Sequence, residues 1–154
     1  MVAAARVAHR HPARHVPRPA LPQRRDPDDA GLRDGVRGLP AQRPSVAKAA
    51  KAVGGPIAVI AGGERWAEGH TLRPAVEDLL GAGAIAHHLG GALSPEARAA
   101  EAAFLAYSDD LPAVLSACAS GRELTAWGHA ADVALASAYG VSATVPRLVD
   151  GVYA

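Results

Sequence analysis

Residues 72–90 read LRPAVEDLLGAGAIAHHLG and predict an apolar helix of mostly small residues. Small and aliphatic residues fill most of the stretch, which is typical of a helix that is buried on several sides. Pro74 is tolerated in a first helical turn. Glu77 and Asp78 then lie near the positive end of the helix dipole, where carboxylates are stabilised. Two adjacent charges in a helix suited to burial indicate either this helix-end effect or a functional site.

A buried strand is predicted just before this helix. Residues 56–64, PIAVIAGGE, form a short apolar run with β-branched members, the pattern of a buried strand over 57–61. Residues 45–55, SVAKAAKAVGG, predict a preceding helix that ends at two glycines. The strand leads into a Gly-Gly turn that carries Glu64 and Arg65. Catalytic groups of open α/β sheets collect beyond the carboxyl ends of strands, which makes both residues site candidates.

The remainder of the chain predicts further helices. Ser94 and Pro95 are a helix start, DDLPAVLSACAS is a short helix, and Ser120 with Glu123 has the spacing of a capping box. A last helix is expected to end at Gly140, before an extended segment with a turn at 150–151. One clear strand cannot form a sheet. We therefore expect an α/β fold, an incomplete layered α/β domain with a disordered N-terminal segment.

Composition limits the classes of protein that fit. With 154 residues the chain suits one domain. Cys118 is the only cysteine of the sequence, so an internal disulfide is excluded. No apolar run approaches the roughly 20 residues of a membrane span, and no signal-peptide pattern follows the basic start. We expect a cytoplasmic protein without a membrane partner, and homo-oligomer formation is left open.

Residues 1–44 differ from the rest of the chain. Residues 1–48 carry a formal charge of +6 and the remainder −5. Seven prolines and nine arginines lie in 1–44, and neither helical nor strand periodicity is present. Such composition favours a disordered basic arm. An arm that binds nucleic acid is a weaker alternative, because no aromatic residues are interleaved for base stacking.

The predicted helix offers a candidate site. Arg73 and Glu77 fall on one helical face together with Gly81, Ala84 and His88. One interpretation is a surface ion pair with glycines for close packing. The other is a cleft in which carboxylates hold a hard divalent cation and the arginine binds a phosphate or sulfonate.

Other polar residues are weighed in the same way. Arg122 lies in a first helical turn, where the dipole disfavours a cation, so an anionic partner is considered for it. His87 and His88 are adjacent and cannot both bind one metal from a regular helix. We assign these two, His70 and His129 to packing or to the surface, and Cys118 to a buried helical position.

Two separated motifs resemble one family. The run SGRELTAWGHAADVALASAYGVSATVPRLVDGVY and the run AVIAGGERWAEGHTLRPAVEDLLGAGAI are similar, in order and spacing, to the C-terminal half of the 2-phosphosulfolactate phosphatase family. The resemblance covers about residues 45–154. It implies Mg²⁺-dependent hydrolysis of 2-phospho-3-sulfolactate, a small anionic phosphoester, on a route to coenzyme M.

The family's N-terminal motifs are absent from residues 1–44 as protein, but two of them return in another reading frame. If residues 21–26, LPQRRD, are encoded as ctc-ccc-caa-cgg-cgc-gac, a shift of one base reads Ser-Pro-Asn-Gly-Ala-Thr. If residues 38–43, GLPAQR, are encoded as ggc-ctg-ccc-gcg-caa-cgc, the same shift reads Ala-Cys-Pro-Arg-Asn-Ala. We therefore interpret residues 1–44 as a frameshifted segment and residues 45–154 as the C-terminal part of the phosphatase-like domain.

By position and charge, we predict catalytic roles for Glu64, Glu77 and Asp78, with the last two holding Mg²⁺. Arg65, Arg73 and Arg122 are the predicted substrate-binding residues. An inactive fragment of the family remains the main alternative. The missing N-terminal motif contains an Asp and an Arg, and without them the cleft would be incomplete.

Overall fold

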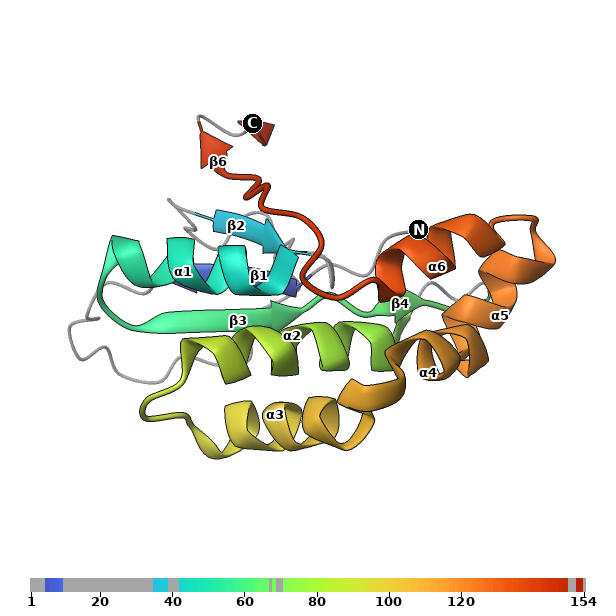
Figure 1. The fold of residues 1–154 in the computed structure, drawn as a ribbon, viewed down its shortest axis with the longest axis horizontal. Coiled ribbons are helices and arrows are strands. Elements are labelled where there is room, and N and C mark those ends of the chain that lie inside the picture. The colour runs from blue at the N-terminus through green and yellow to red at the C-terminus, as the bar shows by residue number, and fades with distance from the viewer. Residues whose placement is uncertain are drawn as a thin grey trace.

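The structure, a computed structural model, describes residues 5–9, 35–38, 42–66, 68, 71–149 and 152–153. Most of the segment 1–44, His70 and the predicted turn at 150–151 therefore lie outside the described residues. The described part is mostly helical, with a few short strands (Figure 1). None of its helices is both long and apolar enough to cross a membrane.

The helices and strands are numbered in chain order, and Figure 1 labels most of them. The helices are α1 (Arg43–Val53), α2 (Val76–Leu89), α3 (Pro95–Tyr107), η3 (Ser108–Asp110), α4 (Leu111–Ala117), α5 (Ala119–Ala126) and α6 (Ala130–Ser137). The strands are β1 (Ala5–His9), β2 (Gly35–Gly38), β3 (Ile57–Ala61), β4 (Glu64–Arg65), β5 (Leu72–Arg73), β6 (Leu148–Val149) and β7 (Val152–Tyr153).

The largest sheet has three antiparallel strands in the order β2-β1-β3. β3 has the predicted bounds, but β1 and β2 lie in a segment for which no strand was predicted. Their pairing uses backbone groups, which nearly every residue carries whatever its side chain. Because β3 pairs antiparallel with β1, the described sheet is not the open α/β type from which Glu64 and Arg65 were inferred as site candidates. β3 is also half-buried to exposed rather than buried, since among the described strands it pairs along one edge only.

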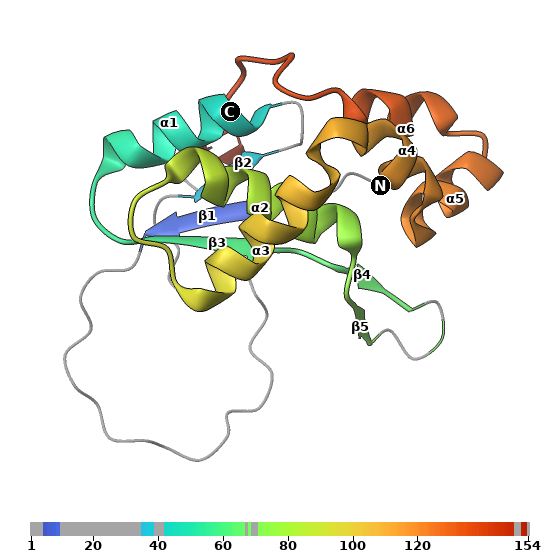
Figure 2. The same cartoon turned by 60° about the horizontal axis from the view of Figure 1, so that its bottom comes forward.

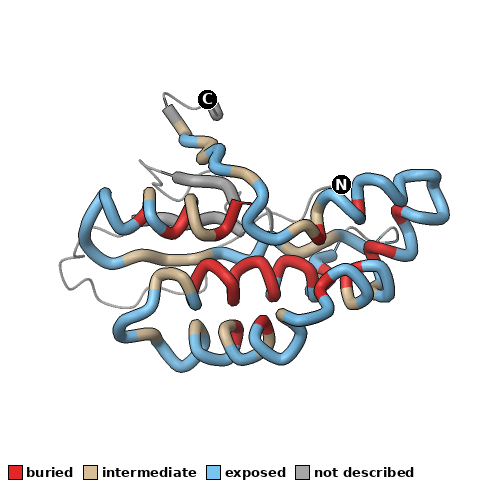
Figure 3. Tube along the Cα trace, in the orientation of Figure 1, coloured by how far each residue is buried: buried red, intermediate tan, exposed pale blue. Residues whose placement is uncertain are grey.

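α2 is the centre of the fold and is the longest continuous buried segment of the described chain (Figure 3). Figures 1 and 2 show α2 between α3 and the layer that contains α1 and β3. On one side Ala82 and Ile85 pack against Val46 and Ala50 of α1. On its other side α2 contributes Leu80 and Ala84 to a second core cluster, with Phe104, Leu111 and Leu115. The predicted burial of this helix is confirmed.

Small residues allow this central packing. A Cβ atom on Gly83 would lie 2.0 Å from the carbonyl oxygen of Ala100. Only glycine therefore lets the backbones of α2 and α3 approach as closely as they do. The Ala-rich composition of the chain thus serves close contact between helices.

Several helix ends agree with the sequence patterns. Ser94 caps α3 by accepting a hydrogen bond from the Ala97 N–H at 3.2 Å, as predicted. Gly54, with φ of 81°, ends α1, also as predicted. α6 ends at Ser137, three residues before the predicted Gly140. That glycine still adopts a positive φ of 68°.

Two predicted helix starts are wrong. α2 begins at Val76 rather than at Leu72, because Pro74 disfavours the helical conformation for the residue before it. The capping box of Ser120 and Glu123 is not formed. The residue that caps α5 is Cys118, whose sulfur accepts a hydrogen bond from the Gly121 N–H at 3.3 Å.

Candidate functional site

Arg73 lies on strand β5 and not on the helix that was predicted to carry it. β5 pairs with β4, so that Arg73 stands opposite Glu64. The Arg73 side chain is buried and its residue is only 8% exposed. Its guanidinium carbon lies 5.4 Å from the ring centre of Trp66, a cation–π contact. Of the two interpretations of Arg73 and Glu77, the surface ion pair is therefore wrong, since both residues are buried and Arg73 pairs with Glu123.

Glu77 and Asp78 occupy the first turn of α2, as predicted, and both are buried, at 8% and 3% exposure. The Gly63 N–H donates a hydrogen bond to Oδ2 of Asp78, which ties the Gly-Gly turn to the helix. Gly63 has φ of 72°, and a Cβ there would meet Leu72 at 2.9 Å. This turn therefore requires glycine.

Glu77 makes one unusual contact. Its Oε2 accepts a hydrogen bond from the Cys118 thiol at 3.7 Å, while its buried Oε1 has no hydrogen-bond partner among the residues that the structure describes. A buried carboxylate oxygen without a donor is unfavourable by about 1–3 kcal/mol or more. Such an oxygen is a natural position for a ligand.

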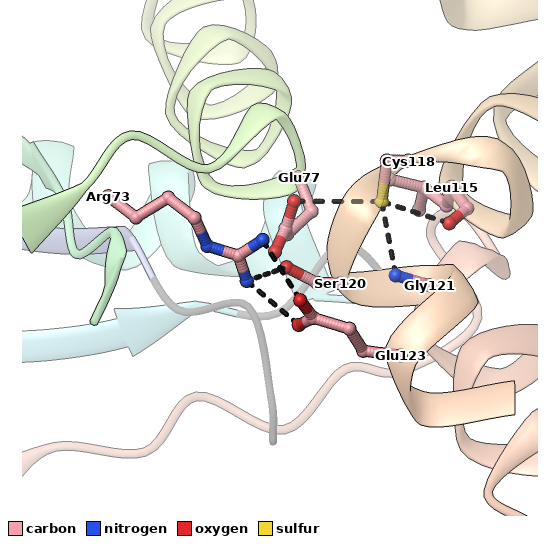
Figure 4. A network of polar contacts seen from close by, with 7 residues as sticks. All are labelled: Arg73, Glu77, Leu115, Cys118, Ser120, Gly121 and Glu123. Carbon is pink, nitrogen blue, oxygen red and sulfur yellow. Dashed lines mark hydrogen bonds and ion pairs between the residues drawn. The ribbon is translucent and has the colours of Figure 1, made fainter. Parts of the chain in front are cut away.

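The start of α5 completes this group of side chains (Figure 4). Glu123 accepts two hydrogen bonds from Arg73, at 3.2 Å and 2.9 Å. Ser120 accepts a third at 3.4 Å. Pattern analysis assigned Ser120 and Glu123 to a local cap, and no local signal connects them to a strand about fifty residues earlier. Trp66 was likewise not predicted.

The structure gathers four of the six predicted site residues. Glu64, Arg73, Glu77 and Asp78 lie around the start of α2. Arg65 is exposed on β4, and Arg122 is exposed on α5. Cys118 is half-buried between α4 and α5 rather than within a helix.

Of the histidines assigned to packing or the surface, the three that the structure describes lie outside the group, in agreement with that assignment. His87 pairs with Glu101, His88 contacts Tyr139, and His129 pairs with Asp132.

Negative charge predominates in this group, in which four carboxylates accompany one guanidinium. The pKa of Glu64 is raised, chiefly by burial and then by the charges of Glu77 and Asp78, while Arg73 opposes the shift. Burial also raises the pKa of the Cys118 thiol, so the cysteine is a poor nucleophile near neutral pH. The excess of carboxylates favours a cation here.

No three His, Cys, Asp or Glu side chains within the described residues are arranged to hold a metal ion. Mg²⁺ nevertheless needs few protein ligands, since it keeps several waters and is held by one or two carboxylates together with substrate phosphate. The unpartnered Oε1 of Glu77 fits that requirement.

A pocket of about 460 Å³ adjoins the first turn of α2. Its walls come from the end of β3, the Gly-Gly turn, β5 and the start of α2. The lining residues are Ala61, Gly62, Gly63, Leu72, Pro74, Ala75, Val76, Asp78 and Leu79. Asp78 is the single charged residue among them, so this wall alone offers no positive group to an anion.

A second buried charge lies away from this group and was not predicted as a special position. Arg43, the first residue of α1, is 0% exposed, and within the part of the chain that the structure describes its three guanidinium nitrogens have no hydrogen-bond partner. Its guanidinium carbon lies 5.6 Å from the Phe104 ring and 5.7 Å from the Tyr139 ring. Burial lowers the pKa of Arg43 to about 10, although Tyr139 opposes the shift.

Carboxylates gathered with an arginine at the start of a helix are typical of sites that handle phosphate and a divalent cation. The family model of 2-phosphosulpholactate phosphatase matches residues 42–151. The chain therefore belongs to the 2-phosphosulpholactate phosphatase family, as its motifs predicted. A comparison with curated proteins returned no match.

Proposed function

We propose that this chain carries out, through the site at the start of α2, Mg²⁺-dependent hydrolysis of the phosphate ester of 2-phospho-3-sulfolactate. The products are sulfolactate and phosphate, on a route to coenzyme M. The observation that carries the proposal is the family match over residues 42–151. The buried carboxylates of the first turn of α2 support the same class of chemistry.

Glu77 and Asp78 are the proposed Mg²⁺ ligands. The carboxylate group fits a hard cation, because Glu77 has a buried oxygen without a partner and the surrounding charge is negative. When bound, Mg²⁺ neutralises phosphate charge and orients a water. Without a cation these carboxylates would repel a phosphoester, which accounts for a metal requirement.

Other residues of the chain are proposed to bind the substrate and to transfer a proton. Arg73, held beside the carboxylates, and the exposed Arg65 and Arg122 are proposed to bind the phosphate and the sulfonate. Glu64 is the proposed group for proton transfer. Burial and the neighbouring carboxylates raise its pKa, and a carboxyl group with a raised pKa is better matched to acid–base work near neutral pH.

The test is release of inorganic phosphate from 2-phospho-3-sulfolactate by the full 154-residue chain, with Mg²⁺ and with EDTA. Activity should require Mg²⁺ and should fall by about 100-fold or more in Glu77→Gln. Glu101→Gln, which alters a carboxylate paired with a histidine away from the site, is the matched control. Activity that persists in EDTA would contradict the proposal.

A specific observation favours a second candidate, an inactive fragment whose residues before 45 come from a shifted reading frame. Arg43 is fully buried, and its guanidinium makes no hydrogen bond to any described residue. An unpaired buried charge is unfavourable by several kcal/mol, whereas cation–π contacts contribute only about 0.5–2 kcal/mol. The one-base shift that reads Ala-Cys-Pro-Arg-Asn-Ala from residues 38–43 places alanine at this position. Alanine carries no charge to bury.

The fragment hypothesis also fits the apolar pocket, whose described wall lacks a positive side chain. The DNA upstream of codon 45 decides the reading frame. A frame-corrected chain should hydrolyse the substrate, and the 154-residue chain should not. Equal activity of the two chains, or an upstream sequence without the shifted motifs, would contradict the fragment hypothesis.

A further inference from the structure

The first turn of α5 contacts two different residues of the proposed site. It lies about fifty residues after β5 in sequence, yet Ser120 and Glu123 reach Arg73, and Cys118, which caps the helix, reaches Glu77 (Figure 4). These contacts fix both a predicted anion-binding residue and a predicted metal ligand. The turn is therefore more than a connection between α4 and α6.

Glu123 holds Arg73 in a defined plane. Two parallel N–H to oxygen bonds, of 3.2 Å and 2.9 Å, form a bidentate pair, which restrains orientation as well as position. Trp66 lies over the guanidinium at 5.4 Å and restrains it further. The Glu123 side chain is 45% exposed, whereas that of Arg73 is 10% exposed. The pair thus faces solvent from its glutamate side.

Cys118 orients the Glu77 carboxylate. Its sulfur lies 3.7 Å from Oε2 of Glu77 and 3.1 Å from the Leu115 carbonyl oxygen, and it accepts from the Gly121 N–H. The single thiol proton is shared between Oε2 of Glu77 and the nearer Leu115 carbonyl, and Oε1 of Glu77 has no hydrogen-bond partner among the described residues. Metal binding at Oε1 would not have to displace the thiol.

Gly121 explains how α5 comes so close to its neighbours. A Cβ atom at this position would lie 1.9 Å from the Leu115 carbonyl oxygen, so only glycine fits. Each polar or small residue at the start of α5 thus has a defined contact. Cys118 caps the helix and contacts Glu77, and Gly121 allows the close backbone contact. Ser120 and Glu123 accept hydrogen bonds from Arg73.

We propose that Glu123 is the positioning residue for Arg73, and that it acts by holding the guanidinium where an incoming phosphate meets it. The inference rests on the proposed function, since it assigns Arg73 to phosphate. It goes beyond that function in assigning a role to the first turn of α5. Loss of the Glu123 carboxylate should weaken phosphate binding when it is measured in saturating Mg²⁺.

The experiment compares wild-type chain, Glu123→Gln and Glu101→Gln. Calorimetry measures the affinity for Mg²⁺ and then for inorganic phosphate in saturating Mg²⁺, at a temperature at which circular dichroism shows all three chains folded. Phosphate affinity should fall by about tenfold in Glu123→Gln and remain constant in Glu101→Gln. Unchanged or higher phosphate affinity in Glu123→Gln would overturn the proposal.

A second readout does not depend on the proposed function. NMR of ¹⁵N-labelled chain should resolve slowly exchanging guanidinium protons of Arg73, identified by their loss in Arg73→Lys. The signals should disappear in Glu123→Gln and persist in Glu101→Gln. If the wild-type chain binds neither Mg²⁺ nor phosphate, the proposed function fails, while the NMR comparison still decides whether Glu123 holds Arg73. Persistence of the signals in Glu123→Gln would overturn that role.

Discussion

Arg73 and Arg43 are both buried arginines, yet their surroundings are opposite in kind. Arg73 has a bidentate carboxylate, a hydroxyl and an indole ring as partners. Arg43 is enclosed, and its guanidinium nitrogens make no hydrogen bond within residues 42–66, 68, 71–149 and the other described segments. A buried charge is tolerated when it is paired and strongly unfavourable when it is not. The difference indicates that the first belongs to a built site and the second is a poor match to its position.

The same substitution should therefore have opposite effects at the two positions. The larger effect is expected at Arg73. Arg73→Met removes the one cation beside four carboxylates and should lower the free energy of unfolding by about 3 kcal/mol, measured by urea denaturation. Arg98→Met, at an exposed position on α3, should change it by no more than about 0.5 kcal/mol. An unchanged free energy of unfolding in Arg73→Met would contradict the proposed difference between Arg73 and Arg43.

Arg43→Met should stabilise the protein. Methionine keeps much of the side-chain volume while it removes the unpaired charge, so the free energy of unfolding should rise by about 2 kcal/mol. Lys48→Met alters an exposed cation on the same helix and is the control, with an expected change near zero. A loss of stability in Arg43→Met would show that the guanidinium is compensated within the protein.

Gly121 and Gly81 offer a further matched pair. Gly121→Ala forces a Cβ into the Leu115 carbonyl and should destabilise by about 1–3 kcal/mol. It should also displace the turn that holds Arg73. Gly81→Ala, with open space around the added Cβ, should stabilise by up to about 1 kcal/mol through helix propensity. Equal thermal shifts for both variants would contradict the close contact of α5.

The smallest effect concerns the pH dependence at Glu64. Its pKa is raised in the folded chain, so its ionised form is disfavoured by folding. Its unfavourable contribution is absent below the unfolded pKa, near 4.5, and develops as pH rises through the folded pKa. Glu64→Gln should therefore be more stable than wild type at pH 7, by no more than about 0.5 kcal/mol because solvent screens the group. The two chains should converge at pH 4, and a difference that grows on acidification would contradict the sign.

Much of the helical framework is predictable from the sequence. The ends of α1 and α3, the bounds of β3 and the burial of α2 follow from glycine, proline and capping signals and from an apolar pattern that act locally. The position of Arg73 outside helix α2 could also have been predicted, because Pro74 disfavours the helical conformation at the residue before it. Sequence patterns alone could not show that β3 pairs antiparallel with β1. They could not show that Glu123 reaches Arg73, because both contacts join distant parts of the chain.

The most direct test of the site at the start of α2 is Mg²⁺ binding to the 154-residue chain, measured by titration calorimetry for wild type, Glu77→Gln and Glu101→Gln. Glu77→Gln keeps the side-chain shape and removes the charge at the buried oxygen that has no partner. Saturable binding in wild type and Glu101→Gln, with a loss of at least about tenfold in affinity in Glu77→Gln, is the predicted result. Equal affinity in all three chains, or no binding by wild type, would contradict the assignment of this site.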